Sequence, residues 1–196
     1  MKARTVFVAF AMVLALCAGG CSRQRPSEQL TARTLAQPTE LEGVPCAAGK
    51  AWFDAMEKLA SCVLSRDATV GAVQLPGGTW IHLTRDGKPD YCFLPRDTVI
   101  QGHRCKGSGH SYMTAFQPGG ALELCWLAED ETIHGVPCMQ ASFLSEVFGG
   151  GAGTYFHEDG TVARCKLAAD TTIGGRSLRR GDHVVLDRAG KLKEPQ

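Results

Sequence analysis

A block of residues recurs along this chain, and the recurrence limits the folds open to it more than any other feature. The block Cys125–Cys138 aligns without a gap with Cys92–Cys105 and with Cys165–Leu178. Two weaker copies precede these three, one starting at Cys62 and one ending at Cys46. A repeat of some 30 to 40 residues is typical of units that bury their apolar faces against their neighbours. The sequence therefore predicts a row of similar modules.

Each unit contains the pattern of a β-hairpin, in which apolar residues flank a turn pair. Asp-Gly and Gly-Gly pairs supply the positive φ angles that tight hairpins need. After the turn, Cys-x-Leu alternates and places cysteine and leucine on one face of a strand. We therefore predict a mainly β fold over residues 39–196, with tandem β-hairpin repeats stacked as a short meander or array. The turn pairs are Asp86-Gly87, Gly119-Gly120, Asp159-Gly160 and Ala189-Gly190.

Two segments depart from the repeat. Residues 51–61 are rich in helix formers and have Met56-Glu57 where later units have Asp-Gly. We favour a hairpin there because the following Cys62-Val63-Leu64 keeps the register of the repeat. Residues 139–148 place apolar side chains at helical intervals before a glycine-rich stretch, which predicts one short helix.

The N-terminus carries an export pattern. Lys2 and Arg4 precede the apolar run Thr5–Leu16, which is too short to span a bilayer stably. The segment Leu16–Ser22 resembles the lipobox of bacterial lipoproteins, in which small residues precede a cysteine that is acylated and becomes the new N-terminus. The resemblance implies a signal peptide over residues 1–20, a membrane anchor at Cys21 and retention at the outer membrane. Simple secretion after cleavage near Gly20 is the alternative.

Residues 21–38 are polar and lack periodicity, which predicts a flexible tether between anchor and repeats. Removal of residues 1–20 takes away two of the 21 Lys and Arg residues and leaves 19 against 20 Asp and Glu residues. This near-neutral balance predicts no nucleic-acid partner and no anionic-lipid partner.

Seven cysteines follow Cys21, and exported cysteine-rich chains normally contain disulfides. If the second cysteine of one unit pairs with the first of the next, only Cys92 stays unpaired, because Leu75 occupies the position of its partner. The competing scheme joins Cys92 to Cys105 and Cys125 to Cys138, and spacing alone leaves it open. The bridges of the favoured scheme are Cys46–Cys62, Cys105–Cys125 and Cys138–Cys165.

The opposite face of the Cys-x-Leu strands is apolar in the middle units. Tyr91 and Phe93 flank Cys92, and Leu124 and Trp126 flank Cys125. One interpretation is an exposed patch that binds an envelope protein or a glycan. The other is a second small core, covered by the helix predicted at 139–148.

No motif for catalysis, a cofactor or a metal stands out. His103 and His134 lie near cysteines, but no Cys-x-x-Cys or His-x-x-x-His spacing occurs. His110 lies between two serines without the Gly-x-Ser-x-Gly elbow of hydrolases. The sequence therefore predicts no catalytic residue, no metal site and no cofactor.

Over residues 45–193, the hairpin repetition resembles MORN-type β-hairpin repeat proteins and their antitoxin-like members. The Tyr-x-Gly-x-Trp signature of those repeats is absent, so no residue role carries over. The leading hypothesis is a non-enzymatic, lipid-anchored envelope protein that acts as a scaffold or partner-binding module. The alternatives are an immunity or antitoxin-like envelope protein and a small secreted cell-wall hydrolase.

Overall fold

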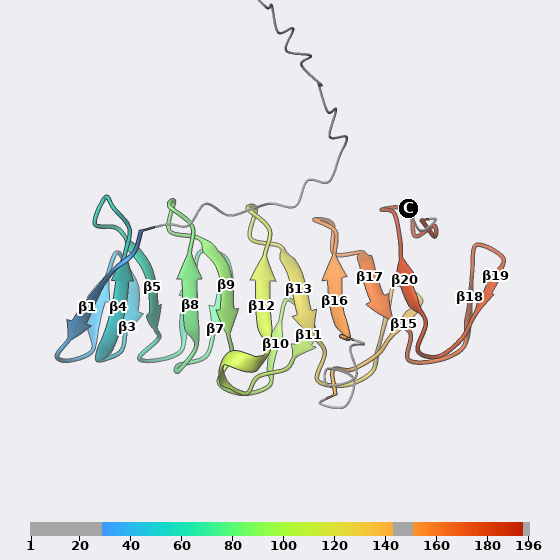
Figure 1. Cartoon of the computed structure of the whole chain (residues 1–196), viewed down its shortest axis with the longest axis horizontal. Coiled ribbons are helices and arrows are strands. Elements are labelled where there is room, and N and C mark those ends of the chain that lie inside the picture. Colours follow the sequence, from blue (N-terminus) through green and yellow to red (C-terminus); the bar gives the residue numbers. More distant parts are fainter. Residues whose placement is uncertain (1–28, 143–150, 194–196) are drawn as a thin grey trace, which may run out of the picture.

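The computed structural model describes residues 29–142 and 151–193, and an antiparallel sheet of ten strands runs through them (Figure 1). Neighbouring strands in the sheet follow one another along the chain, so the sheet is a meander. The predicted mainly β array is thereby confirmed. The ten strands are β1 (Thr31–Leu35), β4 (Gly49–Phe53), β5 (Leu59–Val63), β8 (Trp80–Leu83), β9 (Pro89–Phe93), β12 (Met113–Phe116), β13 (Leu122–Trp126), β16 (Gly153–Phe156), β17 (Val162–Lys166) and β20 (His183–Val185).

Five small hairpins lie between successive pairs of sheet strands along the chain and pack on one side of the sheet, which we call the inner side. Their apolar residues, among them Val73, Ile100 and Ile133, belong to the same buried cluster as inner-side residues such as Ile81. The fold thus has two layers around one core. The small hairpins are β2 (Thr39–Leu41) with β3 (Val44–Cys46), β6 (Ala68–Val70) with β7 (Val73–Leu75), β10 (Thr98–Ile100) with β11 (His103–Cys105), β14 (Glu131–Ile133) with β15 (Val136–Cys138), and β18 (Thr171–Ile173) with β19 (Arg176–Leu178).

Residues 51–61 form the hairpin β4–β5, as favoured from the repeat. Glu57 takes the left-handed conformation there, with a φ of 62°, whereas Gly87 takes it in the next sheet hairpin, with a φ of 77°. Asp54 compensates for the missing glycine, because its Oδ1 accepts hydrogen bonds from the backbone N–H groups of Met56 (2.8 Å) and Lys58 (2.9 Å). Turn chemistry therefore outweighs the helix propensity of this segment.

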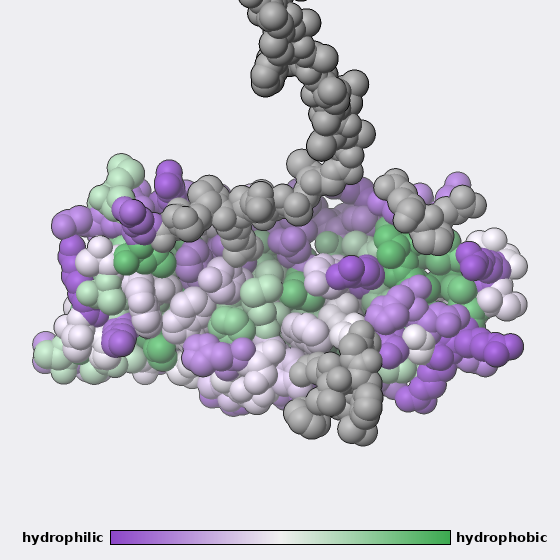
Figure 2. Space-filling model, viewed as in Figure 1, coloured by the Kyte–Doolittle hydropathy of each residue, from purple (hydrophilic) through white to green (hydrophobic). Residues whose placement is uncertain are grey.

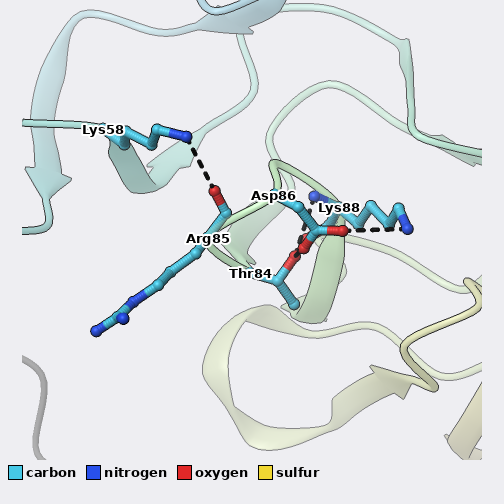
Figure 3. A network of polar contacts seen from close by, with 5 residues as sticks. All are labelled: Lys58, Thr84, Arg85, Asp86 and Lys88. Carbon is cyan, nitrogen blue, oxygen red and sulfur yellow. Dashed lines mark hydrogen bonds and ion pairs between the residues drawn. The ribbon is translucent and has the colours of Figure 1, made fainter. Parts of the chain in front are cut away.

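The neighbouring turn shows how the sheet hairpins are closed (Figure 3). The Thr84 hydroxyl donates to Asp86 Oδ1 at 2.7 Å and accepts from the Lys88 backbone N–H at 3.1 Å. The bond from Thr84, followed by the Lys88 side chain with its Nζ 3.1 Å from Asp86 Oδ2, holds the pKa of the Asp86 carboxyl below its usual value. Lys58 Nζ donates to Arg85 O at 3.4 Å and so connects this turn to the preceding one.

The Cys-x-Leu strands point both residues into the core, as alternation requires. Cys92 and Leu94 are fully buried, and so are their counterparts in the other units. Three disulfides join the two layers, with Cα–Cα distances of 5.5 to 5.8 Å. They follow the scheme that pairs neighbouring units, and Cys92 is the free, buried cysteine. The disulfides are Cys46–Cys62, Cys105–Cys125 and Cys138–Cys165.

Two backbone hydrogen bonds accompany each disulfide. One donor is the residue after the cysteine of the small hairpin, and the other lies three residues after the cysteine of the sheet strand. Both bonds connect the small hairpin to the same sheet strand that the disulfide joins to it. They are Ala47 N to Val63 O (2.7 Å), Ser65 N to Pro45 O (2.8 Å), Lys106 N to Trp126 O (2.6 Å), Ala128 N to Arg104 O (2.8 Å), Met139 N to Lys166 O (2.8 Å) and Ala168 N to Pro137 O (2.8 Å).

The junction between β7 and β9 lacks all three connections, and we call it the unlinked junction. Leu75 replaces the cysteine that would face Cys92. Pro76 and Pro95 stand where the two donor residues stand elsewhere, and proline has no backbone N–H. At this junction, Leu75 on β7 and Cys92 on β9 contribute to the connection by packing in the core.

Two boundaries differ from the sequence-based expectation. The predicted tether of residues 21–38 is too long, because Thr31–Leu35 forms the edge strand β1 and pairs with β4. This strand is mostly exposed, so it carries no alternating apolar signal and its pairing rests on the backbone. The helix predicted at 139–148 is absent from residues 139–142, and its remainder lies outside the described residues.

The predicted signal peptide and Cys21 also lie outside the described residues. Within residues 29–142 and 151–193, no helix combines the length and apolar character needed to cross a membrane. The helical structure described there is a single 3₁₀ turn at Gly109–Ser111.

Candidate functional site

Aromatic side chains gather on the outer side of the sheet, opposite the small hairpins. Strand alternation explains their direction: Ile81 and Cys92 face the core, so Trp80 and His82 on β8, and Tyr91 and Phe93 on β9, face outward. Cross-strand pairing sets Trp80 beside Phe93 and His82 beside Tyr91. Two further rings join them from β4 and from the 3₁₀ turn. We call this set the aromatic face: Trp52, Trp80, His82, Tyr91, Phe93 and His110.

Trp80 lies at the centre of the aromatic face, because it contacts the other five rings. The rings of His82 and Tyr91 are stacked, with centroids 4.7 Å apart and planes 15° apart. Such pairs add to the energy of burial and hold the rings in place. The Trp80 centroid lies 5.7 Å from those of Tyr91 and Phe93, 6.1 Å from His110, 6.3 Å from His82 and 6.4 Å from Trp52.

None of these six rings is fully buried. The five rings on strands are half-buried, and His110 is exposed, so each presents some surface to solvent. A carboxylate borders the rings, since Asp90 Oδ2 lies 3.5 Å from His82 Nδ1. The face is therefore an apolar platform with a polar edge. This composition suits binding more than acid–base chemistry.

The four residues singled out from sequence do not form one patch. Tyr91 and Phe93 belong to the aromatic face, whereas Leu124 is buried, with 5% of its surface exposed. Gly153 packs so closely that a Cβ built on it would lie 3.1 Å from Leu124 Cδ1. Trp126 is half-buried, and its ring lies 5.8 Å from that of Tyr112.

The chain on either side of residues 143–150 packs against this part of the sheet. Ala141 and Ala152 are fully buried, and Ala141 N donates to Leu127 O at 2.8 Å. Lys106 Nζ donates to Ala141 O at 3.0 Å and lies 5.3 Å from the centre of the Tyr112 ring. The Leu124 half of the predicted patch is thus a second small core, and the Tyr91 half is the candidate site.

Sequence reasoning missed Trp52, Trp80, His82 and His110. A signal for Trp80 and His82 was present, because alternation with the apolar Ile81 and Leu83 directs them outward. His110 could not be placed, since it reaches the face through an irregular turn after the third unit's small hairpin.

A hollow of about 220 Å³ lies at the turn end of the sheet near His103 and Phe156. Its polar groups already serve the fold. Gln101 donates to Gly120 O at 2.7 Å and accepts from Leu122 N at 2.9 Å. His103 Nδ1 lies 2.8 Å from Glu131 Oε1. We therefore consider this hollow a weaker candidate for a functional site than the aromatic face.

Comparison with known proteins assigns this chain to no family. No family model, curated protein or solved structure matches the chain. The candidate site is thus argued from its own geometry.

Groups that could carry other chemistry are few in the described part of the chain. No group of three or more His, Cys, Asp or Glu side chains there could hold a metal ion. The one free thiol described is that of Cys92, and burial raises its pKa to about 12. At neutral pH this thiol is protonated and enclosed, so it behaves as an apolar core residue.

Proposed function

We propose that this chain is an exported, lipid-anchored, non-enzymatic binding module of the cell envelope that holds an envelope glycan on its aromatic face. The observation that carries the proposal is the cluster of six partly exposed rings around Trp80. Trp and Tyr are enriched where proteins bind partners, because they offer large rigid contact areas with a polar handle.

The shape of the site favours a linear polymer over a small molecule. The rings extend from β4 to β9, which are separated by three strand spacings, or about 14 Å. They stand on a hydrogen-bonded sheet and contact one another, so little ordering is needed on binding. Flat rings can stack on the apolar faces of sugars.

The disulfides support the choice of compartment. Three disulfides in a domain of this size are typical of proteins that fold in an oxidising environment outside the cytoplasm. The lipobox resemblance supplies the anchor, with Cys21 as the acylated residue and a tether that ends before β1 at Thr31. Several acyl chains on one cysteine would hold the protein firmly at a membrane.

The aromatic face can be tested with two tyrosines of matched position. Tyr91 and Tyr155 lie in the same row of cross-strand pairs on the outer side, connected through Ala115 and Leu124. Only Tyr91 belongs to the aromatic face, because Tyr155 lies under Arg164. We expect Tyr91→Ala to weaken co-sedimentation with insoluble cell-wall glycan about tenfold, or about 1.4 kcal/mol, and Tyr155→Ala to change it less than about twofold.

Trp80→Ala should weaken this binding at least as much as Tyr91→Ala, since Trp80 contacts every other ring of the face. Equal losses of glycan binding in Tyr91→Ala and Tyr155→Ala would show that the aromatic face is not the binding site. If the protein binds envelope proteins but no glycan, and only Tyr91→Ala loses that binding, the aromatic face would still be the binding site. Its partner would then be a protein.

The anchor has a separate test. Mass spectrometry of the exported protein should find a chain that begins at Cys21 and carries acyl groups. In chains that have lost residues 1–20, Cys21→Ser should allow a wash at about 0.5 M salt to release the protein from the membrane fraction, because a polar tether and a folded β domain then remain. An unmodified chain that begins near Cys21 would instead indicate simple secretion.

A further inference from the structure

Charge is unevenly distributed along the array, although the whole chain is nearly neutral. Between Lys106 and Arg164 the sequence has no Lys or Arg at all, but seven Asp and Glu residues. From Arg164 to Lys193 it has eight Lys and Arg residues against three Asp residues. We call these eight the basic end: Arg164, Lys166, Arg176, Arg179, Arg180, Arg188, Lys191 and Lys193.

The structure brings the basic end together at one terminus of the array. Its residues lie on β17, on the hairpin β18–β19, and in the segments around the edge strand β20 (Figure 1). Figure 2 shows hydrophilic residues in the lower part of this end of the molecule, beside hydrophobic residues above them. Seven of the eight side chains are exposed, and Lys166 is half-buried.

Few of these cations form ion pairs within the fold, although Arg164 lies over the Tyr155 ring, 4.1 Å from its centroid. In the first units, basic residues pair with acidic ones, as Arg33 does with Glu57 at 2.9 Å. Among the described residues, the basic end contributes one ion pair, between Arg188 and Glu158 at 3.2 Å. The remaining seven positive charges therefore have no ion-pair partner within residues 29–142 and 151–193.

The three aspartates of this segment are occupied by backbone donors. Asp170 Oδ1 accepts from Arg180 N at 2.7 Å, and Asp182 Oδ2 accepts from Arg179 N at 2.8 Å. Asp187 Oδ1 accepts from the N–H groups of Ala189 and Lys191, both at 2.9 Å. They close turns and do not form ion pairs with the cations, so the field at this end is strongly positive.

We infer that the basic end docks on the phosphate headgroups of an anionic phospholipid membrane. The cations surround the end of the array, which suits a fluid surface whose headgroups can rearrange around them. Val185 on the edge strand β20 is 42% exposed among these charges, and an apolar residue beside cations is typical of surfaces that settle into a membrane interface.

The inference deepens the proposed function and rests on its lipid anchor, which would bring the basic end near a membrane. Attraction between exposed charges fades beyond about 8 Å at physiological salt, so an anchor that holds the basic end near the membrane would strengthen the contact. The tether joins the array at β1, nine strand spacings or about 43 Å from β20. Attachment at both ends would lay the array along the membrane, and the second contact would gain from the first.

Sedimentation with lipid vesicles tests the inference without the anchor. The mature chain from residue 21, carrying Cys21→Ser, is mixed with vesicles of phosphatidylcholine alone or of phosphatidylcholine and phosphatidylglycerol in a 3:1 ratio. We expect binding only to the anionic vesicles, and its loss at about 0.5 M salt, because screening then acts within a few ångströms.

A pair of charge-reversal variants locates the contact. Arg176→Glu with Arg180→Glu should reduce the partition coefficient on anionic vesicles at least about tenfold. The matched control, Lys50→Glu with Arg104→Glu, makes the same change in net charge at exposed positions elsewhere in the array and should reduce it less than about threefold. Melting temperatures close to that of the parent chain would show that both variants are folded.

Three outcomes would overturn the inference. They are equal binding to both kinds of vesicle, equal losses in the two variants, and retention on immobilised heparin that depends on Arg176 and Arg180 without vesicle binding. The last outcome would assign the basic end to an anionic polysaccharide. Because the tested chain has no acyl group and an intact aromatic face, these outcomes leave the tests of anchor and glycan binding independent.

Discussion

Replacing Cys105 and Cys125 together with alanine should lower the free energy of unfolding by about 3 kcal/mol beyond the loss of the two buried side chains. The disulfide joins residues 20 positions apart and so restricts the unfolded chain. It also ties β11 to β13 in the middle of the array, where both neighbouring units depend on the two layers staying together. Urea unfolding of the variant and the parent protein measures the difference.

Cys92→Ala is the control for this comparison, because it removes a buried cysteine without breaking a bridge. We expect it to cost about 1 kcal/mol, the effect of a small cavity. A double variant that costs no more than twice the control would show that the cross-link contributes nothing. Unfolding of the double variant in two separate steps would show that the disulfide couples the halves of the array.

Much of this architecture could be predicted because one local rule is repeated. The turn pair Asp86-Gly87 fixes a hairpin, and alternation then fixes the directions of Cys92 and Leu94. Even the departure at Met56-Glu57 could be resolved, since the register of the following strand limited the alternatives. The favoured disulfide scheme came from the same repetition: pairing the second cysteine of each unit with the first cysteine of the next leaves only Cys92 unpaired, although spacing alone left the competing scheme open.

What could not be predicted depends on contacts between units. The sequence shows strands and turns, but not that one hairpin of each unit joins a continuous sheet while the next packs on its inner side. Leu124 illustrates the difficulty, because alternation directs it outward, yet it is buried and Gly153 of a later strand packs closely against it. The aromatic face has the same origin, since Trp52 and His110 reach it from other units.

Net charge does not describe how charge is distributed along the chain. An overall balance near zero predicted no anionic partner, and that prediction did not consider the absence of Lys and Arg between Lys106 and Arg164. The fold turns this linear segregation into a spatial one, because a meander keeps sequence order along its axis. In such an array, charge should therefore be counted unit by unit.

The unlinked junction between β7 and β9 combines three substitutions of the repeat. Leu75 removes the disulfide, and Pro76 and Pro95 remove the two backbone donors that tie the layers elsewhere. Each change alone could be neutral drift of the repeat, but together they leave one small hairpin, β6–β7, held to β9 by packing. This junction lies directly beneath the aromatic face, because Cys92 on β9 alternates with Tyr91 and Phe93.

Leu75→Cys should therefore create a fourth disulfide with Cys92 and stabilise the protein. The positions correspond to Cys46 and Cys62, whose Cα atoms lie 5.8 Å apart, and the sequence separation is nearly the same. Closing this loop should contribute about 3 kcal/mol, while trimming the buried leucine should cost about 1 to 2 kcal/mol. We expect a net gain of about 1 to 2 kcal/mol in the free energy of unfolding, measured in urea.

Thiol counting under denaturing, non-reducing conditions gives the direct readout. Both chains start at residue 21 and carry Cys21→Ser, so that the acylation site adds no thiol. We expect one free thiol in the parent chain and none in Leu75→Cys. Leu75→Ala is the matched control, which trims the same side chain without a bridge and should lose about 2 to 5 kcal/mol. If Cys92 stays reactive in the denatured Leu75→Cys protein, or if the introduced cysteine pairs elsewhere, the two layers at this junction are not aligned as at the others. In that case the equivalence of the units, on which the fold argument depends, fails at β7 and β9.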